Sequence, residues 1–378
     1  MLETAIVGGG LCGLALARSL HQDGHEVALF EARPRLGGRV LSTSSESTRQ
    51  RVDLGPTWFW PDSQPLITQR ITELELDSFL QHDEGQVLVL QDPEKPPKIA
   101  QLEGVHSGAR RLVGGMTSMI EALARDLPPE RVHAGHVLHA VVQRPDGVQL
   151  EFRNGGARVF VLARRVVLAV PPRLLAEQVH FEPALESDLL TAMHETPTWM
   201  ATTAKAIVRY ARAVWRDAGH SGNAFVQHER VVLDEIFDAC DASGELAALG
   251  GFFALPPEVR RNFRAGMGLL LASQMTQVFG PSLGEIEQHV HDWAGEPFTC
   301  SERDLNEADP TAAHPRYGSA LLADPCWDGR VHFAGSETAD REGGYLEGAL
   351  EAALRVQREL ASVAHVVGVC AQASGVSP

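Results

Sequence analysis

A glycine-rich turn near the start of the chain has the spacing that can hold the pyrophosphate of a dinucleotide. Gly8, Gly10 and Gly13 form the pattern G-x-G-x-x-G. The first glycine permits a tight turn, the second lets a pyrophosphate approach the backbone, and the third lets a helix lie close on a sheet. Glu31 lies 18 residues beyond Gly13, near the position where an acid accepts hydrogen bonds from ribose hydroxyls. These residues predict dinucleotide binding; the alternative, a plain strand–helix turn, needs no such acid.

The elements that must carry this turn follow from the pattern of apolar residues. Residues 4–7 predict a strand, residues 14–20 have apolar side chains at helical spacing, and residues 26–30 predict a second strand. Gly24 is a natural stop for the helix between them. A strand, a glycine turn, a helix and a second strand that ends at Glu31 form the context in which the glycine pattern is specific.

The residues that follow Glu31 resemble one flavoprotein family. The stretch E-A-R-P-R-L-G-G-R at 31–39 resembles the E-A-x-x-R-x-G-G-R segment of the flavin amine oxidase superfamily, which includes monoamine oxidase-like enzymes and soluble bacterial members. In that family the glycine pair lets the chain pass close to the FAD pyrophosphate, and the arginine that matches Arg39 neutralises it. A solvated basic loop is the alternative for the arginines, and Cys12 is interpreted as a small buried residue. The resemblance implies FAD contacts from Gly8, Gly10, Leu11, Cys12, Gly13, Glu31, Ala32, Arg33, Gly38 and Arg39.

Later segments resemble further motifs of the same family. D-L-G-P-T-W at 53–58 resembles the D-x-G-G-x-x segment beside the flavin ring, with Pro56 where a glycine is usual. F-A-G-S-E-T at 333–338 and G-Y-L-E-G-A at 344–349 resemble two motifs from the end of the FAD domain. The start of the last helix would direct N–H groups at the flavin. These motifs add Gly55, Pro56, Thr57, Trp58, Val137, Gly335, Ser336, Glu337, Tyr345 and Leu346 to the expected FAD contacts, Val137 through its backbone.

The resemblance implies an α/β fold with a Rossmann-type, glutathione reductase-like FAD-binding domain and a discontinuous α+β substrate domain. We expect the FAD-binding domain at 1–60, 110–175 and 315–362, the substrate domain at 61–109 and 176–314, and a C-terminal tail at 363–378. Strand patterns separated by turn residues predict a β-meander over 137–143, 148–152 and 158–162. Residues 166–172 resemble the family's V-V-x-A-x-P-P exit from the FAD domain.

Composition excludes several classes of protein. The 378 residues suffice for two or three domains. The formal net charge of −16 disfavours binding to nucleic acid or to an anionic membrane. Five scattered cysteines argue against a disulfide framework or a structural zinc site and favour a reducing compartment, so we expect a cytoplasmic protein. No apolar run is long enough to span a membrane, and the N-terminus has no signal-peptide pattern.

Two residues are the candidates for catalysis. Lys205, in T-T-A-K-A-I-V-R-Y at 202–210, resembles the family lysine that holds a water against flavin N5, and a solvated strand lysine is the alternative. Tyr345 matches the family tyrosine beside the flavin, one of two rings that orient the amine, and a core tyrosine is the alternative. Because the flavin itself performs the redox chemistry, only a few positioning groups are expected from the protein.

The second ring is where the sequence departs from the family. Counting from W-A-G-E-P-F at 293–298 without gaps places Arg303 at the position of the partner tyrosine. The same count places Glu302 where some members attach the flavin through a cysteine, which predicts non-covalent FAD; a shifted alignment would bring in Cys300. Arg303 either binds a substrate carboxylate or is a surface residue of a charged run.

Three other patterns bear on the chemistry. Trp58, Phe59 and Trp60 either line a substrate pocket or fill the core. His289 and His291, interpreted as part of a helix, would not share a face, and no metal site is expected. No G-x-S-x-G pattern occurs, so hydrolase chemistry has no support.

The leading hypothesis is therefore an FAD-dependent amine oxidase. It would move a hydride equivalent from an amine Cα–H to flavin N5, giving an imine and then an aldehyde, with O2 reduced to H2O2. Its partners would be a small amine and O2, and a homodimer is possible. The alternatives are a desaturase or dehydrogenase of the same superfamily, which oxidises a C–C or ring C–N bond, and a non-catalytic flavin-binding protein.

Overall fold

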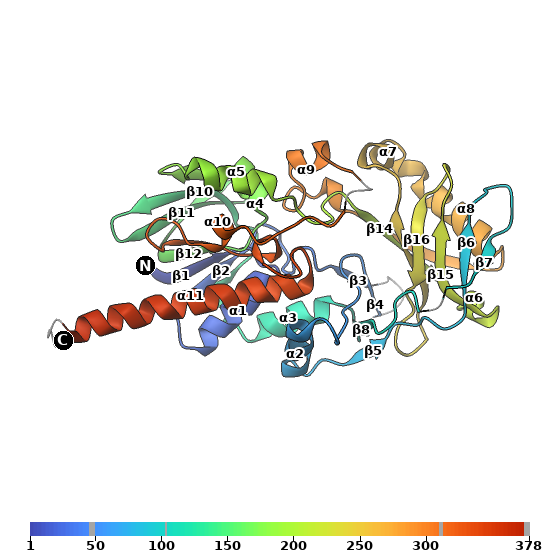
Figure 1. Cartoon of the computed structure of the whole chain (residues 1–378), viewed down its shortest axis with the longest axis horizontal. Coiled ribbons are helices and arrows are strands. Elements are labelled where there is room, and N and C mark those ends of the chain that lie inside the picture. Colours follow the sequence, from blue (N-terminus) through green and yellow to red (C-terminus); the bar gives the residue numbers. More distant parts are fainter. Residues whose placement is uncertain (45–49, 103, 310–312, 374–378) are drawn as a thin grey trace. The chain divides into compact units, whose positions relative to one another are not determined.

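The chain divides into two compact units, each assembled from separate stretches of sequence (Figure 1). The computed structural model describes residues 1–44, 50–102, 104–309 and 313–373, of which 362–373 by their backbone only. The first unit comprises Met1–Gly38, Ile120–Trp199 and His314–Pro378, and the second comprises Arg39–Met119 and Met200–Ala313. Residues 39–60, which we expected with the FAD-binding segments, thus cluster with the second unit, and 176–199 with the first.

Within its described residues, the first unit is built on an eight-stranded sheet in the order β13-β10-β11-β12-β1-β2-β9, with β19 also paired to β12. The strands are β1 (Leu2–Val7), β2 (Val27–Phe30), β9 (Val132–His133), β10 (Val137–Arg144), β11 (Gly147–Asn154), β12 (Ala157–Leu168), β13 (His180–Glu182) and β19 (Val331–Phe333). The helices are α1 (Leu11–Gln22), α4 (Pro172–Gln178), α5 (Ser187–Glu195), α10 (Ala320–Ala323) and α11 (Leu346–Ala373), while α3 (Thr117–Arg125) crosses the boundary between units.

The βαβ unit at the N-terminus confirms the predicted Rossmann-type arrangement. β1 and β2 pair in parallel, with Ala5 opposite Ala28, and α1 joins them. β2 is buried along its whole length, as is usual where helices cover both faces of a parallel sheet. The carboxyl ends of β1 and β2 therefore lie at the same edge of the sheet, where the glycine turn and Glu31 follow.

The meander is confirmed, but its last strand is longer than predicted. β10, β11 and β12 pair antiparallel in sequence. β12 continues without interruption from Ala157 to Leu168, and its second half pairs in parallel with β1 and β19. Residues 163–165 contain no glycine, proline or other turn residue that would have ended the strand.

The last helix also extends further than the sequence suggested. α11 begins at Leu346 and continues to Ala373, beyond the expected start of the tail at residue 363; residues 374–378 lie outside the described residues. Arg355 of this helix donates to the backbone oxygen of Phe333 at 2.6 Å and so binds the end of β19. Among the described residues, no helix is both long and apolar enough to cross a membrane.

In the described part of the second unit, a seven-stranded sheet runs in the order β18-β14-β17-β16-β15-β6-β7. Its strands are β6 (Gln86–Leu90), β7 (Lys98–Ala100), β14 (Ala204–Tyr210), β15 (His220–Val226), β16 (Leu233–Asp238), β17 (Ala247–Phe253) and β18 (Glu285–Asp292). Two small pairs are β3 (Ser42–Ser44) with β4 (Arg51–Asp53), and β5 (Ser78–Leu80) with β8 (Arg110–Leu112). The helices are α2 (Pro65–Glu73), α6 (Val214–Asp217), α7 (Pro257–Asn262), α8 (Met267–Phe279) and α9 (Glu302–Asn306).

The two faces of this sheet are covered differently. Alternate residues of β14, such as Ala206 and Val208, pack with Leu271 and Met275 of α8 in one apolar cluster. Ile207 belongs instead to a second cluster on the other face. Since side chains alternate along a strand, Lys205 points to the same face as Ile207, away from α8.

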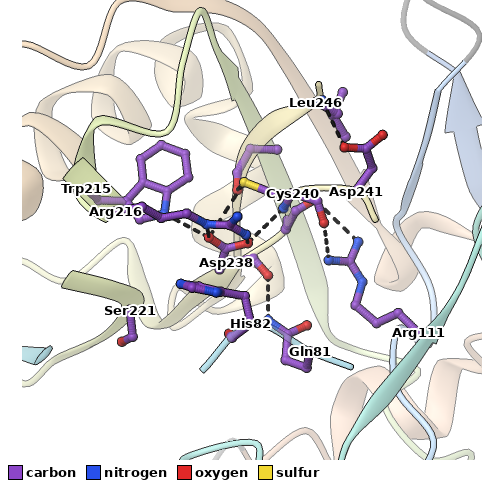
Figure 2. Close-up of polar contacts among 12 residues, drawn as sticks. Gln81, His82, Arg111, Trp215, Arg216, Ser221, Asp238, Cys240, Asp241 and Leu246 are labelled. Atoms are coloured by element: carbon purple, nitrogen blue, oxygen red, sulfur yellow. Dashed lines mark hydrogen bonds and ion pairs between the residues drawn. The ribbon is translucent and has the colours of Figure 1, made fainter. Parts of the chain in front are cut away.

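A buried carboxylate stabilises the end of β16 (Figure 2). Asp238 is fully buried; Arg216 donates to both of its carboxylate oxygens at 2.8 Å, and Trp215 Nε1 donates to one of them at 2.9 Å. Gln81 donates to the Asp238 backbone oxygen at 2.8 Å, and Arg111 to that of Cys240 at 2.8 Å. Gln81, Arg111 and the pair Trp215-Arg216 lie far apart in sequence, and all of them bind the end of β16 or the residues just after it. These contacts hold the neighbouring side chains of this strand end in place.

The interpretation of His289 and His291 as helical is wrong. Both lie in β18, where residues two apart share a face, and His291 is directly opposite Lys205 of β14. Among the described residues, no three His, Cys, Asp or Glu side chains lie close enough together to hold a metal ion.

Candidate cofactor and catalytic sites

The glycine turn of the first unit is shaped by close backbone contacts. A Cβ on Gly8, whose φ is +110°, would lie 2.3 Å from the Ala169 oxygen, and a Cβ on Gly13 would lie 1.9 Å from the Gly8 oxygen. Both positions therefore require glycine, and Gly13 allows α1 to lie close to the strand end. Beside Gly10 the space is open, because a Cβ there would meet nothing nearer than the Gly37 oxygen at 4.0 Å. A phosphate can approach this backbone, at the positive end of α1.

Glu31 is held in place beside that turn. The residue is 4% exposed, and its carboxylate accepts the backbone N–H of Gly9 at 2.7 Å and that of Arg33 at 2.8 Å. A carboxylate has about four lone-pair sites, so two backbone donors leave acceptors for the hydroxyls of a ribose. Ala32 follows directly, and Arg33 is buried with a guanidinium nitrogen 3.9 Å from Glu31 Oε1.

The start of β10 is bound to the same segment by its backbone. Glu31 N–H donates to the His133 oxygen at 2.9 Å, and His136 N–H donates to the Glu31 oxygen at 2.8 Å. Val137 therefore begins β10 next to the acid. Phe30 stacks on His133 at 4.8 Å and on Phe152 at 4.6 Å, so aromatic rings support this end of the sheet.

The end of β19 returns to the glycine turn. Gly335 N–H donates to Cys12 Sγ at 3.2 Å, which joins the predicted C-terminal motif to the predicted N-terminal one. Burial raises the pKa of the Cys12 thiol to about 12, so Cys12 is an inert, neutral acceptor. Ser336 and Glu337 are buried in a 3₁₀ turn at 336–338. Of the other predicted contacts, Leu11 directly follows Gly10 and Gly38 directly follows Gly37.

Tyr345 stands immediately before α11, in the first unit. Leu346 is the first residue of that helix, and Ala349 N–H donates to the Tyr345 oxygen at 3.1 Å. Its side chain is 40% exposed, so it is not a core tyrosine. Burial of its inner part and the nearby Glu342 carboxylate raise the pKa of the phenol, which stays protonated at neutral pH.

Lys205, in the second unit, is deeply buried rather than solvated. It is 2% exposed; its Nζ donates to the Gly55 oxygen at 2.9 Å and makes a short contact with Thr57 Oγ1. The rings of Phe237, Phe252 and Trp58 surround the same nitrogen, with centroids 5.2, 5.5 and 5.8 Å away. The solvated-lysine alternative is thus wrong.

The environment of Lys205 disfavours its charge. Burial lowers the pKa of the ammonium to about 7, and the nearby Arg111 guanidinium lowers this pKa further. The carboxylates of Asp53 and Glu235 act in the opposite direction and raise it. Asp53 is itself buried, and burial raises the pKa of its carboxyl, although Arg111 lowers it. Buried groups whose pKa is shifted this far are concentrated at functional sites, which marks Lys205 as a candidate.

The rings around Lys205 are supported by the Asp238 network, of which Figure 2 shows the contact between Gln81 and Asp238. Trp58 Nε1 donates to Gln81 Oε1 at 2.9 Å, and Gln81 donates in turn to the backbone of Asp238, next to Phe237. Phe252 lies opposite Lys205 on β17. Gly250 leaves room for the ring of Phe237, because a Cβ at position 250 would lie 2.3 Å from that ring. Several strands and loops of one unit thus fix the surroundings of a single ammonium group.

The remaining predicted residues fall as follows in the second unit. Arg39 is half-buried, and Gly55 approaches its backbone so closely that a Cβ would lie 2.1 Å from the Arg39 oxygen. Pro56 lies between Gly55 and Thr57 in the loop beside Lys205. Of the three aromatic residues, Phe59 is core, while Trp58 covers Lys205 and also stacks on His106 at 4.4 Å.

Arg303 lies on the surface of α9. Its side chain is 40% exposed, and its Nε is 2.7 Å from Glu307 Oε1, one helical turn away. Glu302 is the exposed first residue of the same helix, and Cys300 is buried. One residue that does lie beside the Tyr345 ring is His314, whose ring centroid is 4.9 Å away. Sequence counting missed it, because no motif marks residues 299–316.

These observations fit an FAD. The open backbone at Gly10, the buried Glu31 with acceptors to spare and the joining of residues 8–13 to 335–337 match what its pyrophosphate and ribose require. The residues that would hold it in the first unit are Gly8, Gly10, Gly13, Glu31, Val137, Gly335 and Ser336.

Comparisons with known proteins agree with this assignment. A family model described as flavin containing amine oxidoreductase matches residues 95–361, and one described as an NAD(P)-binding Rossmann-like domain matches 6–74. The chain is 24% identical to a flavin-containing amine oxidase of Oncorhynchus mykiss, over 95% of this chain and 85% of that one, and 24% identical to flavin-containing amine oxidase B of Homo sapiens, over 95% and 86%.

Two solved structures share the fold. Putrescine oxidase bound to putrescine superposes with a TM-score of 0.77 at 18% identity, over 96% of this chain and 99% of that one. Cyclohexylamine oxidase from Brevibacterium oxydans also gives 0.77 at 18% identity, over 97% and 99%. The predicted fold class is confirmed.

Proposed function

The chain belongs to the family of flavin-containing amine oxidoreductases, and we propose that it oxidises small amines with a non-covalently held FAD and passes the electrons to O2. Family membership makes it an FAD-dependent oxidoreductase that acts on amines. The amine loses a hydride equivalent from its Cα–H and becomes an imine, water releases an aldehyde and ammonia or a smaller amine, and O2 becomes H2O2. FAD, when bound, supplies the two-electron acceptor.

The observation that carries the proposal is the buried Lys205. This lysine has two oxygen acceptors, three aromatic neighbours and a pKa lowered by burial to about 7, and among the described residues no carboxylate lies within 4 Å of it to form an ion pair. A buried charge with no such partner costs stability. Such a cost is typical of functional residues. We assign Lys205 the role its family counterpart has, which is to hold a water and a positive charge where O2 is reduced.

Tyr345 has the role of a positioning ring. Its exposed phenol, protonated at neutral pH, can orient an amine nitrogen without exchanging a proton with it. The two solved relatives take their names from a diamine and a cyclic monoamine, so both kinds of amine belong in a first substrate screen. A reducing, cytoplasmic compartment and a homodimer remain predictions.

An oxygen-electrode screen with aliphatic, cyclic and aromatic amines tests this function. We expect oxygen consumption, H2O2 and aldehyde in equal amounts with at least one amine. Lys205→Met should be reduced by that amine but react with O2 more slowly in stopped flow, whereas Lys98→Met, on an exposed strand of the same unit, should match the wild type. Substrate oxidation with no imine, aldehyde or ketone would favour the desaturase alternative.

A further inference from the structure

The ring of Tyr345 has a partner within its own unit. The His314 imidazole lies parallel to the phenol, with ring centroids 4.9 Å apart and an interplanar angle of 5°. Trp199 meets both rings edge-on, at 4.4 Å from His314 and 5.9 Å from Tyr345. Offset-parallel and edge-to-face arrangements are those that aromatic pairs prefer. The three residues therefore form a packed group, which we call the Tyr345 ring cluster.

His314 is held in this cluster by a hydrogen bond. Its Nε2 is 3.0 Å from the backbone oxygen of Gly343, and since a carbonyl can only accept, Nε2 carries the hydrogen. Tyr317 packs edge-on against the imidazole at 5.6 Å and donates its hydroxyl to the Pro197 oxygen at 2.9 Å. The imidazole is thus in contact with the rings of Tyr345, Trp199 and Tyr317. Its hydrogen bond to Gly343 fixes it to the turn that precedes Tyr345.

That turn is shaped to receive the cluster. A Cβ on Gly343 would lie 2.5 Å from the Tyr317 ring, and one on Gly344 would lie 2.6 Å from Trp199 Cβ. Gly344 also has a φ of +82°, which side chains rarely adopt. Two successive glycines are therefore required for the rings to lie against the turn, and they precede Tyr345 directly.

The spacing of the two rings limits what can reach the phenol. A methylene group between parallel rings needs a contact of about 3.5 Å to each, or roughly 7 Å between ring planes. The observed 4.9 Å between centroids leaves no such space. The face of Tyr345 toward His314 is closed, and an amine can approach only the remaining exposed part of the ring.

We propose that His314 is the second ring of the amine site and restricts it to slender primary amines, in which the reacting carbon has a single carbon substituent. This rests on the proposed function, because it assumes that Tyr345 lies beside the reacting amine. An R–CH2–NH2 group passes the edge of Tyr345 without moving the imidazole. An amine on a branched or ring carbon requires the volume that His314 fills.

Anaerobic flavin reduction by n-butylamine and by cyclohexylamine tests the proposal. For each amine the limiting reduction rate divided by the dissociation constant is measured in the wild type, His314→Ala, His314→Phe and His139→Ala. His139 is an exposed histidine of the same unit and serves as the control. Displacing even one methylene's volume from a pocket changes selectivity by about 10–200-fold. We therefore expect the preference for n-butylamine to fall at least about tenfold in His314→Ala and to stay within about twofold in the other two variants.

The stack itself can be measured without turnover. In protein labelled with ¹³C at histidine, the His314 ring resonances are identified by their loss in His314→Ala. Tyr345→Leu should shift them downfield, because the phenol that shields them is gone, and the His139 resonances should not move. If His314→Ala does not retain FAD, His314→Val serves in its place, since its side chain is also smaller than an imidazole.

The outcomes separate this proposal from the function it rests on. If neither amine, nor any other, reduces the wild-type flavin, the proposed function fails and this inference fails with it. If amines reduce the flavin but the preference is the same in His314→Ala and wild type, or if the His314 resonances ignore Tyr345→Leu, only the inference is overturned.

Discussion

The buried ammonium of Lys205 makes a prediction about stability that does not depend on turnover. Replacing Lys205 by Met keeps most of the side-chain volume and removes the titrating group. The wild-type lysine has a pKa lowered by burial to about 7, against 10.5 in an unfolded chain. Between these values the unfolded state binds more protons than the folded state, so the wild-type free energy of unfolding rises with pH. Below about pH 7 both states are protonated and the cost of the buried charge is complete.

The size of the effect follows from the shift. A difference of about 3.5 pKa units at 1.36 kcal/mol each corresponds to about 5 kcal/mol over the whole window. Lys205→Met lacks the buried charge, so its free energy of unfolding gains on that of the wild type at low pH. Above pH 7 this gain should shrink by about 1.4 kcal/mol per pH unit. Met also leaves the Gly55 oxygen and the Thr57 hydroxyl without their donor. That cost is independent of pH, so it adds a constant to the difference in free energy of unfolding between the two proteins and does not change its slope with pH.

Urea unfolding of both proteins at saturating FAD, between pH 6.5 and 9.5, measures this difference. Tryptophan fluorescence is suitable because Trp58 and Trp215 lie in the same unit as Lys205. Lys98→Met is the control for losing a lysine from that unit. A gap between wild type and Lys205→Met that stays constant to within about 0.5 kcal/mol from pH 7.5 to 9.5 would refute a buried lysine that titrates near neutrality.

Three further predictions concern the flavin and its neighbours. Acid precipitation should release all FAD into the supernatant, because counting from the motif at 293–298 predicts Glu302, and not a cysteine, at the attachment position; flavin in the pellet would contradict this. Glu31→Ala should weaken FAD binding by about 10–150-fold for each ribose hydroxyl that loses its acceptor, since a hydrogen bond to a charged group is worth about 1.5–3 kcal/mol, while the exposed Glu26→Ala should bind FAD normally in a fluorescence titration. Tyr345→Leu should keep its FAD but be reduced more slowly by the best amine in anaerobic stopped flow; reduction at the wild-type rate would remove Tyr345 from the site.

The cofactor half of the first unit could be predicted from the sequence because its contacts are local or marked by motifs. The glycine turn and Glu31 lie in one βαβ unit, and the distances between Gly8, Gly13 and Ala169 show why no other residue fits. The return of Gly335 to Cys12 spans most of the chain, yet the F-A-G-S-E-T stretch indicated it. Such positions are specified by backbone geometry that few residue types satisfy.

The surroundings of Lys205 and Tyr345 could not be predicted in the same way. Phe237 and Phe252 reach Lys205 through strand pairing, and nothing local in their sequence fixes that register. His314 was missed because an ungapped count led to Arg303, whereas the position of His314 depends on how the Gly343-Gly344 turn folds. Ile286 and Val290 are four residues apart, a spacing that suits a helix as well as a strand, and this explains why β18 was misinterpreted.

An anaerobic titration of the purified holoenzyme with amines tests the central claim most directly. The oxidised flavin absorbance should bleach with one equivalent of a slender primary amine per FAD, one equivalent of aldehyde should form, and admission of air should restore the absorbance with one equivalent of H2O2. If dithionite bleaches the flavin but no amine does, at any concentration up to the millimolar range, the chain does not oxidise amines and the proposed function is wrong.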